Sequence, residues 1–148
     1  MSWMQNAGCL CLVGLLAGST AASDVMKVSW HTDVEHAWNA TQQQQRPLLV
    51  FVTRDNCYYC DQMKDRTFVN TAVAGTINQS FVPLVLDGGG QSPLLKQLNV
   101  TAYPCTFVIS PQAVIMERIP GYVPPEKFAT RLQNHRSQGK VARVVKDP

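Results

Sequence analysis

Two cysteines, Cys57 and Cys60, enclose a pair of tyrosines shortly after the apolar run Leu48 to Val52 and open a segment with helical character. Cysteines at this spacing can close a small disulfide ring. At a helix N-terminus the first thiol also faces unpaired backbone N–H groups and the positive end of the helix dipole. Both favour the thiolate, which is the nucleophile of thiol–disulfide exchange. The arrangement therefore predicts two-electron dithiol/disulfide chemistry.

Other uses of a Cys-x-x-Cys pair agree less well with the rest of the chain. A structural zinc site needs a second pair of ligands, but Cys105 is the only cysteine after Cys60. The three histidines, which lack ligand-like spacing, are His31, His36 and His135. Covalent haem attachment needs a histidine directly after the second cysteine, where this chain has Asp61. No metal site or cofactor is expected, and a purely structural disulfide is the alternative interpretation.

The first 23 residues contain no Asp, Glu, Lys or Arg, and small residues follow an apolar stretch over 7–17. This pattern predicts a signal peptide over 1–23, cleaved near its end, because the stretch is too short for a membrane span. An uncleaved anchor is the alternative. Cleavage removes Cys9 and Cys11. The mature protein is then exported to a periplasmic or otherwise extracytoplasmic compartment, where a disulfide persists.

The remaining part of the chain suits one domain with a single hydrophobic core. We expect this domain over 24–135, followed by a basic tail over 136–148. The formal net charge of +3 is mild. No aromatic residues interleave with the basic residues after Phe128, which indicates a solvated helix face and tail rather than a nucleic-acid surface. The expected assembly is a monomer without a stable membrane span after cleavage.

Apolar periodicity and turn residues predict the element order β-α-β-α-α-β-α-β-β-α. The expected strands cover residues 28–30, 48–52, 81–86, 106–110 and 114–119. The expected helices begin at a capping box of Thr32 and Glu35, at Cys57, after Asn70, at Ser92 and after Pro124. Pro83 lies inside a predicted strand and has no N–H to donate. We therefore expect the edge of the strand that the nitrogen of Pro83 faces to be unpaired. The strand expected over 28–30, which would pair there, is short.

With these elements in place, the chain resembles exported members of the thioredoxin-fold family. Three separated pieces carry the resemblance. They are the strand leading to Cys57, the Tyr103-Pro104 pair before the strand over 106–110, and Gly121 before the final helix. The Tyr103-Pro104 pair matches the family's cis-proline loop, although an ordinary trans turn is the alternative. The resemblance implies an α/β thioredoxin-like fold, a central mixed sheet flanked by helices, with an extra helix after the CxxC helix.

The resemblance also implies an exported thiol–disulfide oxidoreductase. Cys57 would attack a substrate and Cys60 would resolve the mixed disulfide, so that the pair cycles between dithiol and disulfide. The backbone at Tyr103 and Pro104 would bind a substrate strand. The implied partners are protein thiols or disulfides and an upstream redox partner protein. The alternative function is a binding or chaperone-like module in which the CxxC disulfide is structural.

The chain also departs from thioredoxins proper. Asn56 stands in place of the tryptophan before the first cysteine, and Tyr58 and Tyr59 replace Gly-Pro. The tyrosines either form an apolar substrate-binding surface or merely cover the end of the helix. Phe51 occupies the position of the buried aspartate that assists proton transfer to the resolving thiol, which argues against rapid general reduction. Cys105 follows the matched proline, and it either fills the core as a small apolar residue or points towards the CxxC.

Overall fold

The computed structural model describes residues 26–144, so the expected signal peptide, Cys9 and Cys11 lie outside the described residues. Four strands form one sheet in the order β2-β1-β3-β4. Their bounds are β1 Leu48–Thr53, β2 Val82–Asp87, β3 Cys105–Ile109 and β4 Ile115–Pro120. β1 pairs parallel with β2 and antiparallel with β3, and β4 pairs antiparallel with β3. The sheet is therefore mixed, as expected.

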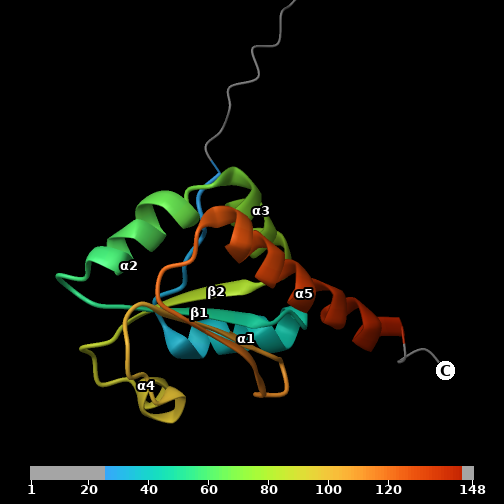
Figure 1. Ribbon diagram of the computed structural model, residues 1–148. Helices are drawn as coiled ribbons and strands as arrows, with labels where there is room; N and C mark the ends of the chain where they lie inside the picture. The colour runs from blue at the N-terminus through green and yellow to red at the C-terminus, as the bar shows by residue number, and fades with distance from the viewer. Residues whose placement is uncertain (1–25, 145–148) are drawn as a thin grey trace, which may run out of the picture.

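Helices cover both faces of this sheet. Their bounds are α1 Val34–Gln44, α2 Tyr58–Gln62, the π-helical turn η1 Met63–Thr67, α3 Thr71–Ser80, α4 Pro93–Leu98 and α5 Pro125–Val144. α2, α3 and α5 lie on one side of the sheet, and α1 and α4 lie on the other (Figure 1). The expected fold class, including the extra helix α3 after the CxxC helix, is confirmed.

Side chains of β1 alternate between two hydrophobic clusters because successive residues of a strand point to opposite faces. Leu48, Val50 and Val52 pack with residues of α1 and α4. Leu49 and Phe51 pack on the other face with residues of η1, α3 and α5. Burial on both faces explains why β1 reads as a continuous apolar run.

The outer edge of β2 differs from the expectation for residues 28–30, which form no strand. A single bridge at His31 replaces it: His31 N–H donates to the carbonyl of Pro83 and Val85 N–H donates to the carbonyl of His31, both at 2.9 Å. Val82 N–H donates inward, to Pro47, so the nitrogen of Pro83 faces the outer edge. The expectation that this side of Pro83 is unpaired is wrong, because the carbonyl of Pro83 faces the same edge and accepts the N–H of His31; only its nitrogen makes no hydrogen bond there.

Two helix starts show how well local signals locate a cap. Asn70 caps α3 as expected, and its side chain accepts hydrogen bonds from the N–H groups of Ala72 and Val73 at 3.1 and 3.2 Å. The capping box expected from Thr32 is wrong by one residue. Asp33 caps α1 instead, accepting from the N–H of His36 at 2.7 Å, because its carboxylate reaches the third helical N–H.

The helix expected over 57–68 is present but changes character after its first turn. It is α-helical to Gln62 and π-helical from Met63 to Thr67. Met63 and Thr67, at the two ends of this π-helical turn, are both completely buried. Thr67 Oγ1 donates to the carbonyl of Val123 at 2.7 Å, and the N–H of Val123 lies 3.3 Å from the sulfur of Met63. These contacts fix the chain that enters α5.

The last helix buries Phe128 and Leu132 fully, as expected. It continues past the expected boundary between the domain and the basic tail, at residues 135 and 136, and ends at Val144. Between residues 26 and 144 no helix is both long enough and apolar enough to cross a lipid bilayer.

Candidate active site at Cys57 and Cys60

Cys57 and Cys60 are joined by a disulfide at the start of α2, with their Cα atoms 5.2 Å apart. Cys57 is the N-cap residue of this helix. Its sulfur accepts a hydrogen bond from the backbone N–H of Cys60 at 3.2 Å. Its carbonyl oxygen accepts from the N–H groups of Cys60 and Asp61 at 3.0 and 3.1 Å. The first sulfur therefore occupies the position from which a side chain satisfies the unpaired N–H groups of a helix start.

The two cysteines differ in accessibility. Cys57 is half-buried, whereas Cys60 is completely buried. Asn56, directly before them, has a φ of 54°, in the left-handed region that asparagine tolerates better than most residues. This turn delivers Cys57 to the surface. Of the two cysteines, Cys57 is therefore the more accessible from solvent.

Tyr58 and Tyr59 project from the first turn of α2 into solvent. Their exposed fractions are 68% and 58%, and their ring centroids lie 5.3 Å apart with the planes inclined by 72°. The rings therefore contact each other edge to face and leave most of their surface open.

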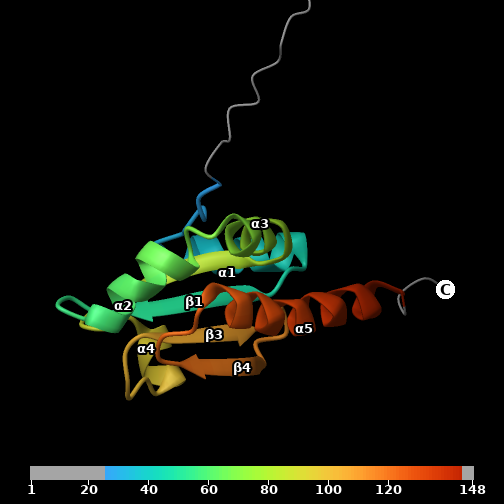
Figure 2. The same cartoon turned by 45° about the horizontal axis from the view of Figure 1, so that its top comes forward.

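The peptide bond between Tyr103 and Pro104 is cis, as the resemblance implied. Pro104 is buried, and its carbonyl accepts the N–H of Gly121 at 2.8 Å. Val52 pairs with Cys105, so this loop enters β3 beside the end of β1 that leads to Cys57. The loop before α2 and the loop before β3 thus lie at one end of the sheet (Figure 2).

Sequence reasoning missed the contacts that hold Tyr103. Its hydroxyl donates to the carbonyl of Gly88 at 3.1 Å, and the guanidinium carbon of Arg54 lies 5.6 Å from its ring centroid. The N–H of Gly88 donates to the carbonyl of Thr53 at 2.7 Å. A Cβ atom on Gly88 would lie 2.1 Å from the ring of Tyr103. The run of three glycines over 88–90 was the available signal, but it indicated only a flexible loop.

Phe51 fills the position where thioredoxins proper carry a buried aspartate. It is 1% exposed, and its ring centroid lies 5.9 Å from that of Trp30 and 4.8 Å from that of Phe68. Phe68 in turn contacts Phe128 at 5.7 Å. This position is therefore part of an aromatic cluster and supplies no proton-transfer group.

Cys105 points into the core on the α1 and α4 side of the sheet, where it packs in the cluster that contains Val52 and Leu98. It is unpaired. Burial raises the pKa of its thiol, and the positive charge of Arg118 partly opposes this. Of the two expectations for Cys105, the structure supports the small buried apolar residue.

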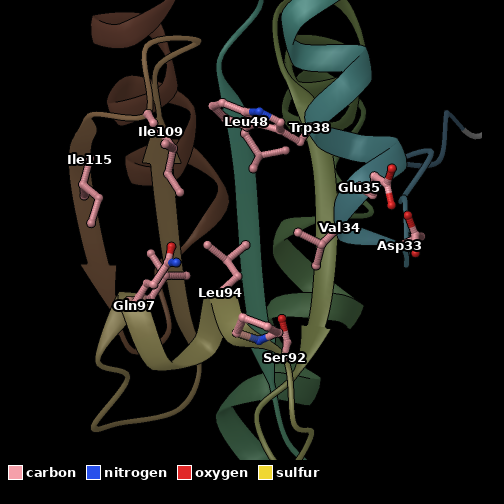
Figure 3. Close-up of a pocket in the computed structure, with 13 residues that line it drawn as sticks. Asp33, Val34, Glu35, Trp38, Leu48, Ser92, Leu94, Gln97, Ile109 and Ile115 are labelled. Atoms are coloured by element: carbon pink, nitrogen blue, oxygen red, sulfur yellow. The ribbon is translucent and has the colours of Figure 1, made fainter.

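Two cavities lie away from the disulfide. One of about 770 Å³ opens between α1 and α4, with Leu48 and Ile109 on its floor and Glu35 at its rim (Figure 3). The other, of about 320 Å³, is lined in part by Trp30, Phe51 and Phe68. Neither contains a residue of the Cys57–Cys60 segment. Among residues 26–144, no group of three or more His, Cys, Asp or Glu side chains is placed to hold a metal ion.

A family model described as a thioredoxin-like domain matches residues 34–136. A thioredoxin from Thermus thermophilus is similar in structure, with a TM-score of 0.68, 21% identity, and coverage of 79% of this chain and 93% of that one. The DsbH oxidoreductase gives a TM-score of 0.66 at 16% identity and covers 84% and 94%. The oxidised C-terminal domain of Neisseria meningitidis DsbD gives 0.62 at 19% identity and covers 72% and 99%. No curated protein matches the chain.

Proposed function

This chain belongs to the thioredoxin-like domain family, and on that premise we propose that it is an exported thiol–disulfide oxidoreductase acting on proteins. One observation carries the proposal. The half-buried Cys57 at the N-cap of α2 is bonded to the completely buried Cys60. The outer sulfur is open to attack, and the inner sulfur reacts only with its neighbour.

The reaction transfers two electrons in two exchange steps. In the reduced protein the thiolate of Cys57 attacks one sulfur of a substrate disulfide, forming a Cys57–substrate bond and releasing the other substrate sulfur as a thiolate. The thiolate of Cys60 then attacks the sulfur of Cys57, which closes the protein disulfide and releases the second substrate sulfur. The two protons lost by Cys57 and Cys60 are balanced by those taken up by the substrate thiolates. The reverse sequence oxidises a substrate dithiol, and an upstream redox partner protein resets the pair.

The groups around Cys57 support its role as nucleophile. The N–H of Cys60 donates to its sulfur, and the N-terminal end of α2 places a positive partial charge beside it. The aromatic cluster at Phe51 offers no acid, so the proton of Cys60 leaves through the departing substrate thiolate or water.

We assign the substrate contact to the surface around Cys57. Tyr58 and Tyr59, whose rings are exposed, directly follow Cys57 in the first turn of α2. The loop of Tyr103 and Pro104 leads into β3 at the same end of the sheet. The disulfide lies outside both cavities described above. The exposed rings beside Cys57 in sequence suit a disulfide presented on a protein surface or an extended segment.

Export is part of the same proposal. It is supported by the first 23 residues, which include an apolar stretch and contain no Asp, Glu, Lys or Arg. It is also supported by the Cys57–Cys60 disulfide, because disulfides persist in oxidising compartments. Mass spectrometry of the protein from its native host tests it. We expect a mature chain that begins near residues 22–24, and an intact Met1 in a cytoplasmic fraction would contradict export.

Trapping of the mixed disulfide tests the reaction. In Cys60→Ala the intermediate stays on Cys57, so we expect reducible adducts with exported proteins on non-reducing gels. Cys57→Ala is the matched control and should trap nothing, because the first attack is lost. Both variants are also made with Cys105→Ala, which removes the remaining thiol of the domain. If Cys60→Ala forms no adduct and Cys57→Ala keeps full biological activity, the disulfide is structural and the protein is a binding module.

A further inference from the structure

Arg54 is the first residue after β1 and lies three residues before Cys57. Its side chain is exposed, and its guanidinium carbon lies 5.6 Å from the ring centroid of Tyr103. A guanidinium within about 6 Å of an aromatic centroid is attracted by the negative face of the ring. The loop that delivers the nucleophile therefore carries a cation stacked on the residue before Pro104.

The ring beneath Arg54 is held in place. The hydroxyl of Tyr103 is bonded to the carbonyl of Gly88, and the N–H of the same glycine is bonded to the carbonyl of Thr53. Arg54 follows Val52 by two residues and Tyr103 precedes Cys105 by two, and Val52 and Cys105 are the last recorded pair of β1 and β3 at this end of the sheet. Both loops are thus fixed to each other, and the charge of Arg54 lies over the ring of Tyr103 on the loop that leads to Cys57.

Neighbouring carboxylates leave this charge without an acidic partner. Within residues 26–144 no carboxylate forms an ion pair with Arg54. Asp61 pairs with Lys64 at 3.5 Å, and the carboxylate of Asp87 accepts the N–H of Gly89 at 3.0 Å. Asp55 is adjacent in sequence and exposed. The guanidinium can therefore still offer its N–H groups to a carboxylate from outside.

We propose that Arg54 selects substrates whose disulfide is flanked by an aspartate or glutamate. The inference rests on the proposed oxidoreductase function and names its substrate class. A planar guanidinium binds a carboxylate with two parallel hydrogen bonds. Because the side chain of Arg54 already lies over Tyr103, it loses less conformational entropy when a carboxylate binds. Arg54 acts on substrate binding, not on the sulfur atoms.

Three short peptides with one internal disulfide test the proposal. They differ only in the residue beside one cysteine, which is glutamate, glutamine or lysine. We measure the second-order rate constant with which the reduced protein reduces each peptide at low ionic strength. Each value is divided by the rate for hydroxyethyl disulfide, a small uncharged substrate. We expect the glutamate peptide to react about threefold to fivefold faster than the glutamine peptide, and the lysine peptide to react slowest.

Variants separate a specific contact from net charge. Arg54→Gln should remove the difference, and Arg54→Glu should reverse the order. Arg136→Glu makes the same change in charge on α5, which extends away from α2 (Figure 1), and should keep the wild-type order. In wild type, salt of about 1 M should reduce the preference, because the screening length falls to about 3 Å.

The outcomes also distinguish the two levels of the proposal. Equal normalised rates for all three peptides with wild type, or an order unchanged in Arg54→Glu, overturn the assignment to Arg54 while the oxidoreductase function stands. A reduced wild-type protein that reduces neither the peptides nor hydroxyethyl disulfide overturns the function and the assignment together.

Discussion

The hydroxyl of Tyr103 donates to the carbonyl of Gly88 at 3.1 Å, and the same ring occupies the space that a Cβ atom on Gly88 would need. This contact joins the loop after β2 to the loop before β3. The N–H of Gly88 also joins it to the end of β1 at Thr53. Gly88 thereby joins the end of β1, the loop after β2 and the loop before β3.

Substitution of Gly88 should be destabilising because of the ring of Tyr103. We expect Gly88→Ala to lower the free energy of unfolding by about 1–3 kcal/mol, the usual range for overpacking. In a Tyr103→Ala background the same change should have little effect, since the clash is absent. Urea unfolding of the single and double variants measures this. Gly89→Ala is the control, because the nearest atom to its Cβ would be 3.5 Å away, and an equal loss from Gly88→Ala in both backgrounds would contradict the explanation.

Phe51 should contribute mainly to stability. Truncation to alanine removes its contacts with Trp30 and Phe68 and leaves a cavity in the core, so we expect a loss of about 3–5 kcal/mol in the free energy of unfolding. Val69→Ala, at a position that is 49% exposed, should change it by less than about 0.5 kcal/mol. Urea unfolding measures both variants. If both substitutions lowered the free energy of unfolding by a similar amount, the loss in Phe51→Ala could not be assigned to the aromatic cluster.

The two thiols of the reduced site should react at different rates. Cys57 is half-buried at the helix start and Cys60 is completely buried, so iodoacetamide at neutral pH should label Cys57 first. The experiment uses Cys105→Ala so that the third thiol of the domain does not contribute, and peptide mapping identifies the labelled residue. Equal labelling of Cys57 and Cys60 would favour a structural disulfide.

Cys105 should make stability depend on alkaline pH. Its folded pKa is raised by burial, so below the unfolded value of about 8.5 both states keep the proton and the full contribution is present. As the pH rises through the folded pKa, the unfolded state is favoured because it ionises first, and this contribution is lost. Urea unfolding at neutral and alkaline pH should show a larger loss for wild type than for Cys105→Ala. Parallel losses in the two proteins would contradict the assignment to this thiol.

Several features of the fold could be read from short stretches of sequence because their causes are local. The apolar run from Leu48 predicts a strand buried on both faces, and Asn70 satisfies N–H groups only two and three residues away. Cys57 precedes a helical segment and therefore takes the cap position. Pro83 lacks its N–H in any context, so its nitrogen had to face the side of β2 away from β1, where the chain forms a single bridge at His31. Each of these depends on a residue and its immediate neighbours.

Other features required the tertiary structure, because they depend on residues far apart in the chain. The hydrogen bond from Thr67 to Val123 accompanies a π-helical turn that periodicity did not indicate. The pairing of Val52 with Cys105 belongs to the register that turns this thiol into the core and not towards the disulfide. Arg54, Gly88 and Tyr103 come from three different loops, and no local pattern marks their contact. Sequence alone therefore located the cysteine pair, whereas packing of the strands decided which side chains lie at the same end of the sheet.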